Sequence, residues 1–168
     1  YLRYLANVRK VAREAADQQR RALNWHLPEP AVLPSLAEER TRLWEHRPDD
    51  ERFLEVRYGL NTQPLALELV PPETTAVDQV DPAAASALHR LLVVHRQQPH
   101  LPASVDLRGF DRIELCGEAD AARSLARSMI CSAAAFHSPD HLVVAVLASD
   151  RNLAHWDWVK WLPHAHSE

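Results

Sequence analysis

Apolar and small residues in the first 26 positions recur at alternating steps of four and three. This seam consists of Tyr1, Leu5, Val8, Ala12, Ala15, Gln19, Ala22 and His26. The spacing and the absence of Gly and Pro predict one long helix over residues 1–26. Because Ala and Gln bury little apolar area, the seam is thin, and we expect this stalk helix to need a packing partner. Pro28, Pro30 and Pro34 then predict an extended connector.

The next part of the chain mixes short helical and strand patterns. Ser35 followed by Glu38 forms a capping-box pattern, which predicts a short helix over residues 35–46. Alternating residues predict strands over 53–60 and 65–70, and the turn residues 61–64 between them favour a hairpin. Asp81 before Pro82 is typical of a helix start, and Pro99 ends that helix.

The strongest architectural pattern lies between residues 113 and 148. A short strand over 112–116 is followed by Gly117, a helical pattern from Glu118 to Phe136, a loop, and the unbroken apolar run 142–148. Such a run is typical of a strand buried on both faces of a parallel sheet. The pattern therefore predicts a right-handed βαβ unit. The expected fold class is α/β, with the stalk helix followed by an incomplete Rossmann-like or RecA-like domain. We expect the stalk and connector to occupy residues 1–34 and the α/β domain to occupy residues 35–168, with its C-terminal part missing.

Composition narrows the functional classes. The 168 residues are 46% hydrophobic, enough for one core with an appendage. No apolar run approaches the ~20 residues of a membrane-spanning helix, and no secretory signal is visible. Cys116 and Cys131 are too few for a disulfide framework; they suit a reducing compartment and are interpreted as apolar core fillers.

The charge is distributed unevenly. Residues 1–26 carry a net charge of +4, so the remainder carries −8 of the total of −4. The basic residues of this arm include Arg3, Arg9, Lys10 and Arg13. A basic arm on an acidic body favours an anionic neighbour, either lipid headgroups or nucleic acid, although a solvated helix with outward Arg side chains explains the same pattern.

The position expected for a nucleotide phosphate is degenerate. The chain has 3 Gly and only two Lys, Lys10 and Lys160, and cannot form a Walker A loop. The start of the helix after Gly117 carries Glu118, Asp120 and Arg123. Carboxylates there stabilise the helix dipole and repel a triphosphate, so we expect no catalytic residue and no bound cofactor in this segment.

Two further groups of residues invite a functional reading. The histidine pairs His137/His141 and His164/His166 lack cysteine or carboxylate ligands at zinc-site spacing, so no metal site is predicted. Trp156, Trp158 and Trp161 can either pack against a sheet edge or form an aromatic docking surface. Stacking of single-stranded nucleic acid is a third reading, which the acidic surroundings disfavour.

Three stretches resemble one known family. The stretch LWEHRPDDERFLEVRYGLNTQPLALELVPPET (43–74), the βαβ pattern and the tail WDWVKWLPH (156–164) are similar to EccC, together with the basic helix YLRYLANVRKVAREAA. EccC is the membrane-anchored FtsK/SpoIIIE-type ATPase of actinobacterial type VII (ESX) secretion systems. In that family two membrane helices precede a stalk, a degenerate nucleotide-binding-type domain and three ATPase domains.

The resemblance implies a place and a set of partners for this segment. It implies a position at the cytoplasmic face of the bacterial inner membrane, where the basic arm fits the positive-inside rule. It also implies an oligomeric complex with EccB, EccD and EccE subunits, anionic lipid headgroups near the arm, secreted proteins handled by distal domains, and ATP and Mg bound only by those domains. Nucleic acid is not an expected partner, because the globular part is acidic. Two functions stay open: a scaffold and coupling segment without its own chemistry, or a nucleotide-binding domain with a non-standard site.

Overall fold

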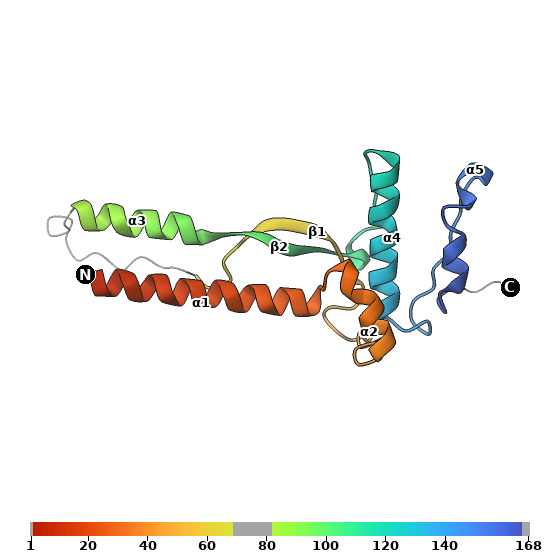
Figure 1. Cartoon of the computed structure of the whole chain (residues 1–168), viewed down its shortest axis with the longest axis horizontal. Helices are drawn as coiled ribbons and strands as arrows, with labels where there is room; N and C mark the ends of the chain where they lie inside the picture. Colours follow the sequence, from red (N-terminus) through yellow and green to blue (C-terminus); the bar gives the residue numbers. More distant parts are fainter. Residues whose placement is uncertain (1, 69–81, 166–168) are drawn as a thin grey trace. The chain divides into compact units, whose positions relative to one another are not determined.

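A computed structural model of the chain describes residues 2–68 and 82–165 (Figure 1). The chain divides into two compact units, one formed by residues 1–26 and 59–103 and the other by residues 27–58 and 104–168. Tyr1, Asp81, His166 and the last residues of the predicted strand 65–70 lie outside the described residues. The mixed α/β composition and the long N-terminal helix that the sequence predicts are both confirmed.

The first unit is built on two helices that lie side by side (Figure 1). Helix α1 spans Leu2–His26 and helix α3 spans Pro82–Arg96. The predicted seam of α1 is its buried face: Leu5 is 7% exposed and Ala12 is fully buried, while Val8, Ala15 and Gln19 are half-buried. On α3, Leu91 is buried. The thin seam thus finds a partner helix within the same chain.

Polar side chains of α1 also bind the backbone of this unit. The Gln19 amide nitrogen donates to the Pro64 carbonyl at 3.0 Å, and its oxygen accepts from the Ala66 amide at 3.0 Å. Arg20 donates to the carbonyls of Pro99 and His100, each at 3.3 Å. Residues that look too polar to stabilise a helix seam therefore hold α1 to distant parts of the backbone.

A two-stranded antiparallel ribbon replaces the predicted hairpin. Strand β1 spans Glu55–Pro64 and pairs with strand β2, Gln97–Asp106. The expected turn 61–64 is the end of β1, so the prediction of a turn there is wrong. Residues 61–64 have turn chemistry, but β2 offers them a partner strand, and that pairing overrides local preference.

The second unit packs short helices around one longer helix. Helix α4, Ala119–Phe136, contacts helix α2, Leu33–Glu39, and the 3-10 helix η1, Pro30–Val32. The further short elements of this unit are η3 (Leu107–Gly109), α5 (Asp150–Leu153) and η4 (Asp157–Trp161). A small core of Leu33, Ala135 and Phe136 lies where α2 meets α4, with Leu36 and Cys131 against it.

Two local predictions in this unit are corrected. Helix α2 begins at Leu33 instead of Ser35, and it ends at Glu39 because Arg40 adopts a left-handed conformation with φ of 55°. The proline connector is not fully extended, because Pro30 opens η1 and Pro34 sits in the first turn of α2. Proline is compatible with both places, where its missing N–H leaves no hydrogen bond unmade.

The strands predicted on either side of α4 are not strands in the structure. Helix α4 matches its predicted range, but residues 112–116 and 142–148 lie outside regular secondary structure. Several of their apolar side chains are exposed, with Val143 at 60% and Leu147 at 97%. A strand exists only by pairing with a neighbour, and within the described residues no neighbouring strand reaches these segments.

We expect Ala12→Leu to lower the free energy of unfolding by about 1–3 kcal/mol, because Ala12 is fully buried and the larger side chain has no room there. Ala6 is exposed on the same helix, so Ala6→Leu is the matched control and should change stability by less than about 0.5 kcal/mol. Urea unfolding of both variants measures the difference. Equal stabilities would show that the face of α1 at Ala12 is not closely packed.

Candidate interaction surface

The C-terminal end of α4 binds the segment that comes after α2. The Trp44 amide donates to the Ala135 carbonyl at 2.9 Å, and the Trp44 indole N–H donates to the Ala134 carbonyl at 3.2 Å. The His46 amide donates to the Phe136 carbonyl at 3.0 Å. The last carbonyls of a helix have no partner within it, and here residues 44–46 supply one for each of these three. The backbone of Trp44 adopts a left-handed conformation, with φ of 58°, in this arrangement.

His137, the residue after α4, is fully buried and bonded at both ring nitrogens. The Leu54 amide donates to Nε2 at 2.8 Å, so Nε2 carries no proton. The proton is therefore on Nδ1, which donates to the Ala133 carbonyl at 2.8 Å. This neutral tautomer is the one form of the ring that satisfies both partners.

A second buried histidine continues the network. His164 Nε2 lies 2.7 Å from the His137 carbonyl, which can only accept, so His164 carries a proton on Nε2, unlike His137. His164 Nδ1 is also buried, and it has no hydrogen-bond partner among the described residues. The Val144 amide donates to the His164 carbonyl at 2.9 Å, which ties residues 142–148 to the tail.

Burial disfavours the charged form of the His137 and His46 rings. Burial lowers the pKa of His137 below its ordinary value of 6.5, and the neighbouring rings of His46 and His164 lower it further, against the opposing effect of the Ala133 hydrogen bond. Burial likewise lowers the pKa of His46, whose ring lies 5.4 Å from that of His137 and 5.5 Å from that of Phe136. The rings of His137 and His46 are therefore neutral at pH 7.

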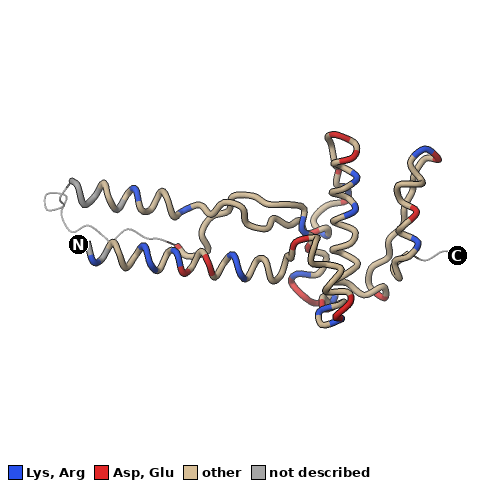
Figure 2. Tube along the Cα trace, viewed as in Figure 1, with Lys and Arg blue, Asp and Glu red and all other residues tan. Residues whose placement is uncertain are grey.

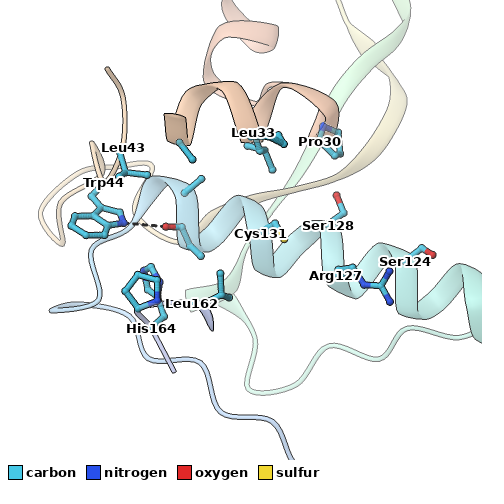
Figure 3. A pocket seen from close by; sticks show the side chains of 15 residues that line it. Pro30, Leu33, Leu43, Trp44, Ser124, Arg127, Ser128, Cys131, Leu162 and His164 are labelled. Atoms are coloured by element: carbon cyan, nitrogen blue, oxygen red, sulfur yellow. Dashed lines mark hydrogen bonds between the residues drawn. The ribbon is translucent and has the colours of Figure 1, made fainter. Parts of the chain in front are cut away.

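An apolar pocket of about 580 Å³ opens beside this network (Figure 3). Its walls come from η1 and α2, from the segment around Trp44, from α4 and from the tail. The lining residues are Pro30, Leu33, Pro34, Ala37, Leu43, Trp44, Ser124, Arg127, Ser128, Cys131, Ala134, Ala135, Leu162, Pro163 and His164. The volume is within the range of pockets that bind ligands or peptide side chains.

The pocket offers little nucleophilic chemistry. Cys131 is half-buried in its wall, and burial raises the pKa of its thiol, so the reactive thiolate is scarce near neutral pH. Cys116 is exposed, contrary to its interpretation as a core filler. Among residues 2–68 and 82–165, no three His, Cys, Asp or Glu side chains lie close enough to hold a metal ion.

The N-terminal end of α4 is occupied by its own chain. Gly117 has a φ of 146°, which glycine alone adopts without strain, and it turns the chain into the helix. The Glu118 carboxylate then accepts from the amides of Asp120 and Ala121 at 3.0 and 2.9 Å. The hydrogen bond from the Asp120 amide is the main cause that lowers the pKa of Glu118. Arg123 pairs with the Asp120 carboxylate. A carboxylate thus takes the amides that a phosphate would need.

The basic residues of α1 are exposed, and some of them meet α3. Arg3, Arg9, Lys10 and Arg13 are all exposed, and Lys10 pairs with Glu14 at 3.8 Å. Figure 2 shows that Lys and Arg recur along α1. Arg9 lines a shallow hollow with Arg90 and His95 of α3. Burial, with the charges of Arg13 and Arg9, lowers the pKa of His95. Positive side chains from two helices therefore share one surface of the first unit.

The three tail tryptophans differ in exposure. Trp158 is half-buried beside the buried Val159, and Trp156 is also half-buried. The Trp158 indole N–H is buried without a partner in the described part of the chain. Trp161 is 80% exposed, so its ring does not pack within the described part of the chain. Asp157 and Lys160 are exposed and pair with each other at 2.6 Å.

The comparisons with known proteins agree on one family, although no protein-family model matches the chain. The ESX secretion system protein EccC of Thermomonospora curvata is 46% identical over 98% of the chain, and the ESX-4 protein EccC4 of Mycobacterium tuberculosis is 40% identical over 98%. The ESX-1 protein EccCa1 of M. tuberculosis is 30% identical over the whole chain. The chain belongs to the EccC family. It spans 12%, 13% and 24% of the length of these three relatives.

This EccC segment contains a site that sequence reasoning missed. The sequence drew attention to the helix start at Gly117 and to the tryptophans, and it raised His137 and His164 only as metal ligands. The buried network instead joins these two residues with His46. A signal was present: His46 lies in one stretch that resembles EccC, and His164 ends another. In the part that the structure describes, no helix is long and apolar enough to cross a bilayer.

We expect the EccC segment to lose stability as the pH falls below about 6.5. The folded protein holds His137 and His46 with lowered pKa values, so the unfolded chain, with the ordinary pKa of 6.5, binds protons first and acid favours unfolding. Each histidine contributes at most about 1.4 kcal/mol per pH unit. Urea unfolding at several pH values between 8 and 5 measures the slope.

A pair of variants assigns this slope to the network. His137→Phe should lower stability at pH 8 and flatten its dependence on pH, whereas His141→Phe, at an exposed position, should keep the wild-type slope. A wild-type stability that is constant from pH 8 to pH 5 would contradict the neutral network.

Proposed function

We propose that this chain is a scaffold and coupling segment of an ESX secretion ATPase. It lies at the cytoplasmic face of the membrane and connects the membrane part of the secretion complex to distal domains that hydrolyse ATP. The homology to EccC proteins of ESX secretion systems supports the part of the proposal that assigns the chain to type VII secretion. The coupling role is inferred from the chemistry of the segment.

The capped start of α4 is the observation that carries the proposal. In nucleotide-binding α/β folds the phosphates bind the free amides at the start of a helix. Here the Glu118 carboxylate already accepts from two of these amides, and Asp120 adds a second negative charge. A triphosphate would have to displace one carboxylate and approach another. The site therefore supports a scaffold segment that does not hydrolyse ATP better than it supports a nucleotide-binding domain with a non-standard site.

The basic surface of the first unit supports an anionic neighbour. Arg9 and Arg13 of α1 and Arg90 of α3 are exposed near His95, in a chain whose net charge is −4. Juxtamembrane basic residues attract anionic headgroups at about 1 kcal/mol each. We infer that this surface faces lipid headgroups and adjacent EccB, EccD or EccE subunits within an oligomeric complex, with secreted proteins engaged by the distal domains.

Calorimetric titration tests whether the segment binds Mg·ATP. We expect Mg·ATP to show no binding tighter than millimolar to the segment, because the Glu118 and Asp120 carboxylates repel the phosphates. Glu118→Gln removes one of the charges and keeps the side-chain length, so it is the matched variant for any weak signal. A micromolar dissociation constant for the wild-type protein would favour the non-standard nucleotide-binding domain instead.

Substitution of the exposed tryptophan tests the docking role of the tail. Trp161→Ala should change the free energy of unfolding by less than about 0.5 kcal/mol, because the ring is 80% exposed, while lowering ESX-dependent secretion. Val159→Ala, in the same 3-10 helix but buried, should cost about 1–3 kcal/mol. Thermal melts and a secretion assay separate the two effects. Normal secretion by a normally folded Trp161→Ala protein would exclude docking through this ring.

A further inference from the structure

The shallow hollow of the first unit brings cationic side chains of two helices together. Its volume is about 320 Å³, at the lower end of the range of ligand pockets. Arg9 of α1 and Arg90 and His95 of α3 supply its polar lining. Its other lining residues are Ala87, Leu91 and Val94 of α3. Among the described residues, no carboxylate lines the hollow, and the only ring in its lining is the imidazole of His95.

The positive charges that meet at the hollow lack a counter-ion in the part of the chain that the structure describes. No ion pair there includes Arg9, Arg90 or Arg13, which lies one helical turn after Arg9. The charges of Arg13 and Arg9 add to the effect of burial in lowering the pKa of His95, and no carboxylate opposes them. An anion in the hollow would replace this mutual repulsion by attraction.

The lining of the hollow fits a phosphate that carries an apolar group. A guanidinium donates through a planar fork that matches the oxygens of a phosphate, so one phosphate can accept from Arg9 and Arg90 together. Val94 is 69% exposed and adds apolar surface beside these charges, which free phosphate would leave in water. Single-stranded nucleic acid fits less well, because the hollow has no Phe, Tyr or Trp on which a base could stack.

The charge around the hollow favours a lipid surface as the source of this phosphate. Residues 1–26 carry a net charge of +4 in a chain whose total is −4. Arg3 and Lys10 are exposed on the same helix, along which positive residues recur (Figure 2). An array of anionic headgroups can meet such a series of charges, whereas a single soluble anion meets only the hollow.

We propose that the hollow binds the phosphodiester headgroup of an anionic phospholipid, which Arg9 and Arg90 hold between α1 and α3 while the first acyl carbons contact Val94. This site rests on the proposed position of the unit at the membrane, and it adds a defined ligand to that position. The shared phosphate joins two helices whose buried seam is thin, so lipid binding stabilises the helix pair.

Vesicle binding by four single variants of the 168-residue chain tests the site. The vesicles are phosphatidylcholine with about one quarter phosphatidylglycerol, and vesicles of phosphatidylcholine alone are the uncharged comparison. Arg9→Gln and Arg90→Gln should each lower the affinity at least tenfold. Arg21 and Arg96 are exposed on the same two helices and do not line the hollow, so Arg21→Gln and Arg96→Gln should lower it at most about fivefold, the effect of one charge near a lipid surface.

Two outcomes of this experiment overturn the site. One is an equal loss of affinity in all four variants, which would show that the charges act diffusely. The other is equal binding of the wild-type chain to both kinds of vesicle. Thermal melts confirm that each variant is folded, and anionic vesicles should raise the Tm of the wild type and not that of Arg90→Gln.

A second pair of variants tests the apolar wall. Val93 and Val94 are neighbours on α3 and are 59% and 69% exposed, but only Val94 lines the hollow. Val94→Asp places a carboxylate where Arg9 and Arg90 can pair with it, so it should lower the affinity for anionic vesicles at least fivefold more than Val93→Asp does. Equal effects of the two substitutions would overturn the contact with Val94.

Competition identifies the ligand. Inorganic phosphate should release the chain from anionic vesicles no better than sodium chloride of the same ionic strength. Release by millimolar phosphate would assign the hollow to a soluble anion, and tighter binding to oligodeoxythymidine that Arg9→Gln abolishes would assign it to nucleic acid; either result overturns the lipid. None of these readouts involves ATP or secretion, so lipid binding can fail while the coupling function holds, and the reverse.

Discussion

The hydrogen bonds of His137 join three parts of the second unit at one buried ring and its backbone. Nδ1 binds the Ala133 carbonyl of α4, Nε2 accepts from the Leu54 amide, and the His137 carbonyl accepts from His164. The last two bonds join segments that are far apart in sequence. Because the ring is fully buried, losing one partner would leave a polar atom without water to replace it, and the cost of that would exceed the value of an ordinary hydrogen bond.

The turn held by His137 is strained and is stabilised from both sides. Leu54 adopts a left-handed φ of 61°, which costs a branched residue free energy, and its carbonyl accepts from the Leu107 amide at 3.0 Å. Arg108 donates to the Glu51 carbonyl at 2.9 Å, and the Ser104 hydroxyl donates to Glu55 at 2.6 Å. The turn therefore depends on contacts with the end of α4 and with the end of β2 together.

The two ends of α4 have opposite relations to their surroundings. At the start, the chain satisfies two free amides with its own carboxylate, Glu118, which would compete there with any anion. At the end, distant segments satisfy the carbonyls, and an apolar pocket opens beside them. The polar groups at both ends of α4 are therefore used for capping and for packing.

Helical periodicity and charge were readable from the sequence because they depend on neighbours three or four residues away. The seam of α1, the range of α4 and the loss of the phosphate loop follow from local spacing and from the residue types at 117–120. Pairing of strands was not readable. Residues 61–64 look like a turn, yet β2 recruits them into a strand. Residues 142–148 look like a central strand, but without a neighbouring strand among the described residues they form none.

The buried histidine network also depends on contacts between distant segments and not on local sequence patterns. His46, His137 and His164 are separated by up to 118 positions, and a lone histidine does not reveal which ring nitrogen will find a partner. The tertiary structure decided that Trp161 is exposed while Val159 two residues earlier is buried, because packing depends on what lies across a surface. The sequence by itself determined helices α1 and α4, the charge and the absence of a Walker loop, since these are local properties. The tertiary structure alone decided the strand pairing, the histidine tautomers and the pocket, because each depends on contacts between distant segments.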